Sequence, residues 1–249
     1  MASDFQSLYV LASGLFYQQR KLEVVSNNLA NLNTNGFKKV LLTAQALPVK
    51  EPEGGKAFSP SPQRAENNFV YPIMGKQKVD TSGGELKKTG NPLDMAINGD
   101  GFFAVKVGGK ILYTRDGHFL LDKNGYLVNQ SGFPVVDENG NKILIGRSSL
   151  AEVRVTRDGV IFVRTRRVAK LKIVQLSGVK HIGNNLYIGE EKPAKNYEVV
   201  QGFVEGSNVN PVEEMVKMIE TVRAYEAFAN GMKALDENNS KLINGVLKA

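Results

Sequence analysis

The sequence predicts a mainly antiparallel, hairpin-rich β domain flanked by long N- and C-terminal α-helices that pair as a coiled-coil-like module. Apolar residues recur at three- and four-residue spacing near both ends of the 249-residue chain, a pattern typical of amphipathic helices. Between these ends, short apolar runs alternate with Asn-Gly and Asp-Gly pairs, which favour tight hairpins. We expect four regions, namely residues 1–36 (helix), 37–82 (connector), 83–201 (β domain) and 202–249 (helix).

The first helix is expected to begin at Ser3, because Gln6 follows three residues later, as in a capping box. Its apolar residues form a seam that only Gln18 interrupts, and the seam consists of Leu8, Leu11, Leu15, Leu22, Val25, Leu29 and Leu32. A second apolar set lies on the opposite side of the helix, at Tyr9, Val10, Phe16, Tyr17 and Val24. A helix on a lone subunit needs only one apolar side. We therefore expect this helix to fray alone and to become ordered when other chains surround it.

The stretch "SNNLANLNTNGFKK" places five asparagines within nine residues at the end of this helix. Near the stop they read as local caps, with Asn35 or Gly36 able to take the left-handed conformation. Inside the helix, an amide can pair with a copy of itself without charge repulsion, because it both donates and accepts. We assign Asn27, Asn28 and Asn31 to self-association, and the helix-end motif to Asn33, Thr34, Asn35, Gly36 and Phe37.

The middle of the chain divides into a connector and a β domain. Residues 37–82 lose all periodicity and are rich in Pro, Gly, Ser and charge, which indicates an extended connector or arm. Residues 83–201 contain β-type runs separated by turn signals, which indicates a compact, mostly antiparallel domain. The turn signals lie at 98–101, 115–117, 123–125, 138–140 and 157–159.

The start of the last helix is well marked. Asn210 can cap it, Pro211 suits the first helical position, and Glu213 and Glu214 favour the helix dipole. Its apolar seam, the second candidate assembly surface, consists of Val212, Met215, Ile219, Val222, Tyr225, Phe228, Met232 and Leu235.

The chain contains few of the residue types that commonly act in catalysis. The chain has no cysteine, which excludes disulfides, thiolate metal sites and cysteine catalysis. His118 and His181 lack partners at metal or triad spacing and read as structural. The "NGDGFFAV" and "DENGNK" segments lack the residues that a phosphate loop or a calcium loop requires. We predict no catalytic residue, no cofactor, no metal and no enzyme activity, with a carbohydrate-active enzyme as the weaker alternative because carboxylates are plentiful.

The net charge of +7 leaves a nucleic-acid- or polyanion-binding β domain as the other alternative. However, the basic residues are dispersed, and the densest run, "RTRRVAK", alternates like the solvated face of a strand. It also lacks the aromatic pattern that single strands require, so we expect no nucleic acid as partner. The N-terminus has no basic start and no apolar run approaches the ~20 residues of a membrane span, so we expect neither a cleaved signal peptide nor membrane insertion.

Four segments together resemble the flagellar basal-body rod proteins. They are "SNNLANLNTNGFKK", "KKTGNPLDMAINGDGFFAV", "YTRDGHFLLDKNGYLVNQSGFPV" and "QGFVEGSNVNPVEEMVKMIETVRAYEAF". The first marks the axial proteins of rod and hook, and the "NPLD…GDGFF" and "EGSNVNPVEEM" segments narrow the resemblance to proximal-rod and distal-rod types. Position 35, commonly proline in the family, is asparagine in this chain.

The resemblance implies a structural role. In that family the terminal helices pair and pack around a central channel, and the β domain faces outward. Subunits pass unfolded through the flagellar type III export apparatus without a cleaved signal. They then join copies of themselves and neighbouring rod and hook proteins in the rod that crosses the periplasm, a helical tube that transmits torque from motor to hook. The chain length and the "AQALPV" segment favour the proximal-rod type, because a distal-rod protein is expected to carry a longer connector.

Overall fold

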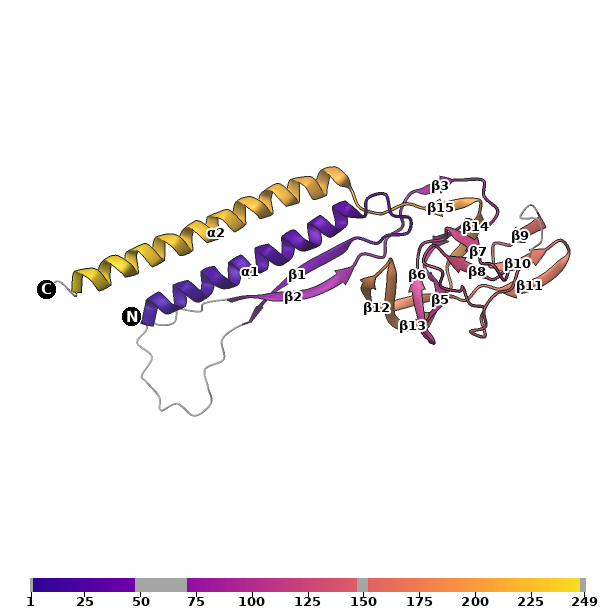
Figure 1. Ribbon diagram of the computed structural model, residues 1–249, viewed down its shortest axis with the longest axis horizontal. Coiled ribbons are helices and arrows are strands. Elements are labelled where there is room, and N and C mark those ends of the chain that lie inside the picture. The colour runs from indigo at the N-terminus through magenta and orange to yellow at the C-terminus, as the bar shows by residue number, and fades with distance from the viewer. Residues whose placement is uncertain (1, 48–70, 147–151, 247–249) are drawn as a thin grey trace, which may run out of the picture. The chain divides into compact units, whose positions relative to one another are not determined.

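The computed structural model describes residues 2–47, 71–146 and 152–246 and is mostly β, with one helix near each end (Figure 1). Helix α1 spans Ala2–Ala30 and helix α2 spans Pro211–Val246. The chain divides into two compact units. The first comprises Met1–Ser26, Leu42–Gln77 and Met215–Ala249, and the second comprises Asn27–Leu41 and Lys78–Glu214. None of the described helices has an apolar stretch long enough to cross a membrane.

The first unit combines the two helices with a pair of strands, β1 (Val40–Leu47) and β2 (Tyr71–Val79). Within it the helices run antiparallel (Figure 1) and approach each other at glycines. A methyl group built on Gly14 would lie 2.5 Å from Cε1 of Phe228, and one built on Gly231 would lie 3.4 Å from Cδ2 of Leu11. The expected connector thus has a strand near each end, and its residues 48–70 lie outside the described part of the chain.

The second unit contains the remaining strands. Strands β12, β13, β6 and β5 close into a small barrel, and a three-stranded sheet and three two-stranded pairings, β14–β4, β15–β3 and β7–β8, surround it. The bounds are β3 (Leu86–Lys88), β4 (Met95–Gly99), β5 (Phe102–Val107), β6 (Lys110–Thr114), β7 (Phe119–Leu121), β8 (Leu127–Asn129), β9 (Val153–Val155), β10 (Val160–Val163), β11 (Arg166–Lys170), β12 (Ile173–Gly183), β13 (Leu186–Pro193), β14 (Tyr197–Gln201) and β15 (Phe203–Glu205).

Strand β5 organises the core because it is buried on both faces. Its "FFAVKV" sequence starts with consecutive apolar residues rather than an alternating pattern, as expected for a fully buried strand. Phe103 and Val105 point into one hydrophobic cluster, whereas Phe102 and Ala104 point into a second one that contains Tyr187. The Phe103 and Phe119 rings meet edge to face with centroids 5.2 Å apart.

The five turn signals divide into two kinds. Residues 123–125 and 157–159 close the β7–β8 and β9–β10 hairpins, and residues 138–140 close a narrow bridge between Val136 and Lys142. Residues 98–101 and 115–117 instead join strands that do not pair with each other, so the expectation of hairpins there was wrong. A methyl group built on Gly117 would lie 1.6 Å from the Met95 carbonyl oxygen. At this turn glycine therefore permits a close backbone approach rather than a hairpin.

Candidate assembly interface

The first helix ends earlier than residue 36, at Ala30, and a series of turns follows. Asparagine side chains help to end it, because Asn31 Nδ2 donates to the Asn27 carbonyl at 2.9 Å and Thr34 Oγ1 donates to Asn31 Oδ1 at 3.0 Å. Such local bonds compete with helical ones. Leu32, the last residue of the predicted seam, consequently lies in a turn rather than in the helix.

Gly36 directs the chain into the β domain. It adopts the left-handed region, with φ of 67°, and its amide donates to the Glu205 carbonyl at 2.7 Å. A methyl group built on it would lie 2.3 Å from the backbone of Arg115. Glycine is thus required twice at this position, by the backbone angle and by the close approach. We call residues 35–40 the junction segment.

Asn28 is the most buried of the five asparagines, with 1% of its surface exposed. Its Oδ1 accepts from the Val40 amide at 2.9 Å, and its Nδ2 donates to the Val40 carbonyl at 2.9 Å and to Glu214 Oε2 at 3.0 Å. All of these bonds lie within one chain and occupy both ends of the amide. We therefore leave Asn28 out of the interface proposed below.

The other asparagines of the prediction lie closer to solvent. Asn27 and Asn33 are exposed, whereas Asn31, Thr34 and Asn35 are half-buried. Asn35 contacts the β domain through its carbonyl oxygen, which accepts a hydrogen bond from Asn185 Nδ2 at 2.6 Å.

Buried charges fix the junction segment. Lys38 Nζ lies 2.7 Å from Glu205 Oε1, and the other oxygen of Glu205 accepts from Arg115 Nε. All three side chains are at most 3% exposed. Lys39 Nζ lies 2.9 Å from Glu214 Oε1 in the first turn of α2. Sequence reasoning missed these residues, because lysines near the end of a helix are common and carry no local signal of burial.

The predicted seam of α1 is mostly half-buried. Val25 is buried, Leu11, Leu15, Leu22, Leu29 and Leu32 are half-buried, and the Leu8 side chain lies outside the described side chains. On the second apolar side Val24 is buried and Tyr17 is half-buried. Phe16 remains 62% exposed, which is a large exposed area for an aromatic side chain.

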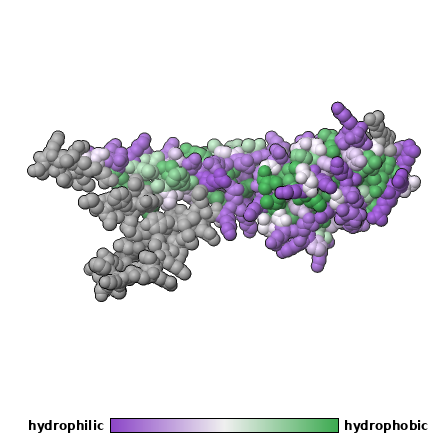
Figure 2. Space-filling model, turned by 60° about the horizontal axis from the view of Figure 1, so that its bottom comes forward, coloured by the Kyte–Doolittle hydropathy of each residue, from purple (hydrophilic) through white to green (hydrophobic). Residues whose placement is uncertain are grey.

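The beginning of α2 carries an exposed apolar stripe. Val212, Met215, Val216 and Ile219 are 69%, 52%, 49% and 54% exposed, and their spacing of three, four and seven residues places them on one helix face. Figure 2 shows hydrophobic residues at the surface of the helices. The prediction included three of the four stripe residues and omitted Val216. Further along α2, its remaining members are half-buried, namely Val222, Tyr225, Phe228, Met232 and Leu235.

The two histidines have no catalytic arrangement within the described residues. His118 is hydrogen-bonded, as expected for a structural histidine: its Nδ1 lies 2.8 Å from Oδ1 of the buried Asp94. The His118 amide also donates to Asp116 Oδ1 at 3.0 Å, and burial raises the pKa of Asp116 to about 6. No hydroxyl group in the described part of the chain bonds to the His118 ring.

His181 lies in an aromatic cluster. Its ring centroid is 5.7 Å from that of Phe37 and 5.3 Å from that of Tyr187. Burial lowers its pKa, which favours the neutral ring. We interpret it as a packing residue. Among the residues that the structure describes, no group of three or more histidine, aspartate or glutamate side chains could hold a metal ion.

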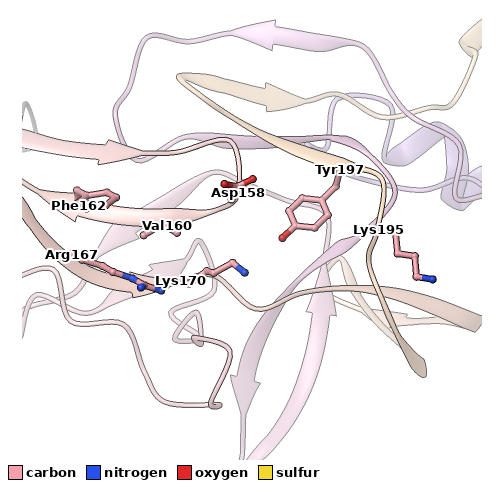
Figure 3. Close-up of a pocket in the computed structure, with 7 residues that line it drawn as sticks. All are labelled: Asp158, Val160, Phe162, Arg167, Lys170, Lys195 and Tyr197. Atoms are coloured by element: carbon pink, nitrogen blue, oxygen red, sulfur yellow. The ribbon is translucent and has the colours of Figure 1, made fainter.

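A hollow of about 470 Å³ lies beside the basic run (Figure 3). Arg167, Lys170 and Lys195 line it together with Asp158 and Tyr197. Lys170 Nζ lies 2.7 Å from Glu138 Oε1, and Figure 3 shows Lys195 pointing away from Lys170. Because acids offset part of the positive charge and the cations do not converge, the hollow does not favour the polyanion-binding alternative.

Comparison with known proteins covers both ends and the middle of the chain. Residues 8–38 match the family described as "Flagella basal body rod protein". Residues 96–163 match "Flagellar hook protein FlgE/F/G D1 domain", and residues 200–245 match "Flagellar basal body rod FlgEFG protein C-terminal". The last match includes the whole exposed stripe of α2.

Relatives share most of the chain. Flagellar basal-body rod protein FlgF of Caulobacter vibrioides is 39% identical over 236 residues, 91% of each chain. Flagellar basal-body rod protein FlgG of Buchnera aphidicola is 35% identical over 260 residues, 95% of this chain and 98% of the relative. The FlgG protein of Bacillus subtilis is 30% identical over 260 residues, 96% and 98% of the two chains. This chain therefore belongs to the flagellar basal-body rod protein family and is a structural subunit of the rod in the flagellar basal body.

Proposed function

We propose that this subunit assembles through its terminal helices with copies of itself and with neighbouring rod and hook proteins, forming a tube that transmits torque from motor to hook. One observation carries the proposal. The stripe of Val212, Met215, Val216 and Ile219 leaves four large apolar side chains about half exposed or more. A contiguous exposed apolar surface on a folded subunit is typical of an interaction site.

The energetic argument is simple. Fully burying one large apolar side chain contributes ~1.5–3 kcal/mol, so covering four half-exposed ones contributes about 3–6 kcal/mol for each neighbour contact. Such a contribution is modest for a single pair of molecules. It becomes large in a tube, because every subunit is held by several neighbours at once.

Helix α1 contributes the second surface of the proposed interface. Phe16 is exposed on the side opposite the seam, and the seam leucines are only half-buried. We keep the exposed Asn27 as a self-pairing amide and leave out Asn31, whose amide, like that of Asn28, is bonded at both ends within the chain. The glycine contacts between α1 and α2 support a coiled-coil-like pairing of the two helices within one subunit.

The remaining parts of the role rest on the family. We propose export through the flagellar type III apparatus without a cleaved signal, a position in the rod across the periplasm, and no enzyme activity. The segment "AQALPV" at residues 44–49 supports the proximal-rod type.

Replacing Ile219 with Asp tests the stripe. Because this side chain is 54% exposed, the lone subunit should keep its circular dichroism spectrum and melting temperature. A buried charge in the assembled rod should be costly, so a strain carrying Ile219→Asp should lose motility and yield basal bodies without this subunit. Asn230→Asp adds the same charge at an exposed polar position of α2 and should support normal motility. Normal incorporation of Ile219→Asp would refute the stripe as an interface.

A further inference from the structure

The buried ions of the junction segment require one another in a definite order. Arg115 is held by the β domain alone, because its Nη2 donates to the carbonyls of Ile97 and Gly99 at 2.9 and 2.6 Å, and its Nη1 donates to the Gly101 carbonyl. Its charge is therefore present in the interior whether or not the junction segment is docked. Glu205 pairs with Arg115 and also accepts from the Gly84 amide at 2.7 Å. Glu205 can thus be satisfied without Lys38.

Lys38, in contrast, cannot be buried favourably without Glu205. If Glu205 were absent, two buried cations would face each other, and burying an unpaired charge is very costly. Burial lowers the pKa of Lys38, Glu205 opposes that shift, and Arg115 adds to it. The Ser82 carbonyl is a further acceptor for Lys38 Nζ, but a neutral carbonyl does not cancel a second positive charge. Docking of Lys38 therefore depends on prior docking of Glu205.

The backbone amides of the junction segment also depend on Glu205 and on residues that follow it. The Gly36 amide donates to the Glu205 carbonyl, and the Lys39 amide donates to Asn208 Oδ1 at 2.7 Å. The side chains of Lys39 and Asn28 both bind Glu214. We call residues 205–214 the closing segment. Bonds of Gly36, Lys38 and Lys39 thus reach partners more than 160 residues later in the chain.

We propose that the closing segment and the junction segment form a latch that closes in sequence, with Glu205 docking on Arg115 first and Lys38 docking on Glu205 second. The end of the N-terminal helix is then anchored only after the C-terminal part of the chain is in place. A subunit that lacks its closing segment loses the charged anchors of its junction segment and keeps only uncharged contacts there, such as those of Asn35 with Asn185 and of the Lys38 amide with Tyr187. The latch thereby prevents an incomplete chain from fully ordering its junction segment on the β domain.

Backbone hydrogen exchange in the full-length protein tests the order of closing. Glu205→Gln keeps the shape of the side chain and removes its charge. The amides of Gly36, Lys38 and Lys39 should then exchange roughly a hundredfold faster, since breaking a buried ion pair costs several kcal/mol. The amides of Leu127 and Val135 in the core of the β domain, which donate to the Ile143 and Leu127 carbonyls at 2.9 Å, should keep their rates. Glu138→Gln, at an exposed ion pair with Lys170, is the matched control and should change neither set.

Lys38→Met tests the reverse direction. Because Glu205 keeps Arg115 and the Gly84 amide, the Gly206 amide, which donates to the Glu85 carbonyl at 2.8 Å, should exchange within about twofold of its normal rate. If Glu205→Gln does not fold, Asn208→Ala takes its place. That variant keeps all charges and should speed exchange at Lys39 about tenfold. The proposal fails if junction amides stay protected without the Glu205 charge, or if Lys38→Met releases Gly206 as strongly as it releases Gly36.

Discussion

The end of α1 and the start of α2 differ in which side chains are buried and which are exposed to solvent. At the end of α1 and in the junction segment after it, polar and charged residues are buried and bonded, as Asn28 and the pair of Lys38 with Glu205 show. At the start of α2, apolar residues such as Met215 and Ile219 are exposed. Burying polar groups is favourable only when every bond is made, and exposing apolar groups is tolerable only when something later covers them. The first region is therefore complete within one chain, whereas we propose that a neighbouring subunit completes the second.

Phe37→Ala should have the largest effect on the lone subunit. The side chain is completely buried and contacts His181 edge to face. Removing a buried phenylalanine ring costs about 3–5 kcal/mol. Urea denaturation should show this loss in the free energy of unfolding. A loss below about 1 kcal/mol would mean that the junction segment is not packed in the lone subunit, and the contrast between the two regions would disappear.

Asn28→Ala should have a smaller but still large effect. It leaves the Val40 amide and carbonyl without their partner and removes one donor from Glu214, so unfolding should become easier by about 2–4 kcal/mol. Asn27→Ala is the matched control, because Asn27 is exposed, and should change stability by less than about 0.5 kcal/mol. Melting of the lone subunit distinguishes the two roles of Asn28. If Asn28→Ala melts normally yet fails to assemble, the amide acts between chains and not within one.

The smallest expected change in the free energy of unfolding comes from pH. It arises from a carboxyl group on the side of the β domain that faces Gly36. Burial raises the pKa of Asp116 to about 6, whereas its ordinary value is 3.8. The folded protein thus binds a proton more tightly than the unfolded chain between these values, so stability should fall as pH rises from about 4 to about 6. The expected loss is about 1–3 kcal/mol.

The Asp116→Asn variant isolates this group from its titratable neighbours Asp94 and His118. The amide can still accept from the His118 backbone but no longer titrates in this range. The difference in unfolding free energy between the two proteins should change across pH 4 to 6. A difference that is constant with pH would show that Asp116 titrates normally.

Local features were predictable from the sequence, and long-range ones were not. The turn at residues 123–125 follows from the Asn-Gly pair alone, and the start of α2 at Pro211 follows from cap, proline and acidic residues. The exposed stripe also follows from spacing, since residues three and four apart share a helix face. Glycines mark both hairpins and close approaches, and no local pattern separates Gly117 from Gly125.

Asn28 shows why the rest could not be predicted. Its partner Glu214 lies 186 residues away, and no periodicity reports which distant carboxylate meets a given amide. The same holds for Lys38 and Glu205, whose charges suggest solvent until the fold brings them together. A polar residue at the end of an amphipathic helix is compatible with a contact within the chain and with a contact between chains, and only the three-dimensional structure distinguishes them.

Cysteine labelling tests most directly whether the stripe is open in the subunit and covered in the rod. The chain contains no cysteine, so Ile219→Cys introduces a single reactive thiol, and Lys110→Cys introduces one at an exposed position of the β domain. Each variant would be labelled with a maleimide both as purified subunit and in isolated basal bodies. We expect both thiols to react rapidly with the maleimide in the purified subunit. In basal bodies the labelling rate at position 219 should be at least tenfold lower, which corresponds to about 1.4 kcal/mol of protection. Equal reactivity at position 219 in the two states would contradict the account.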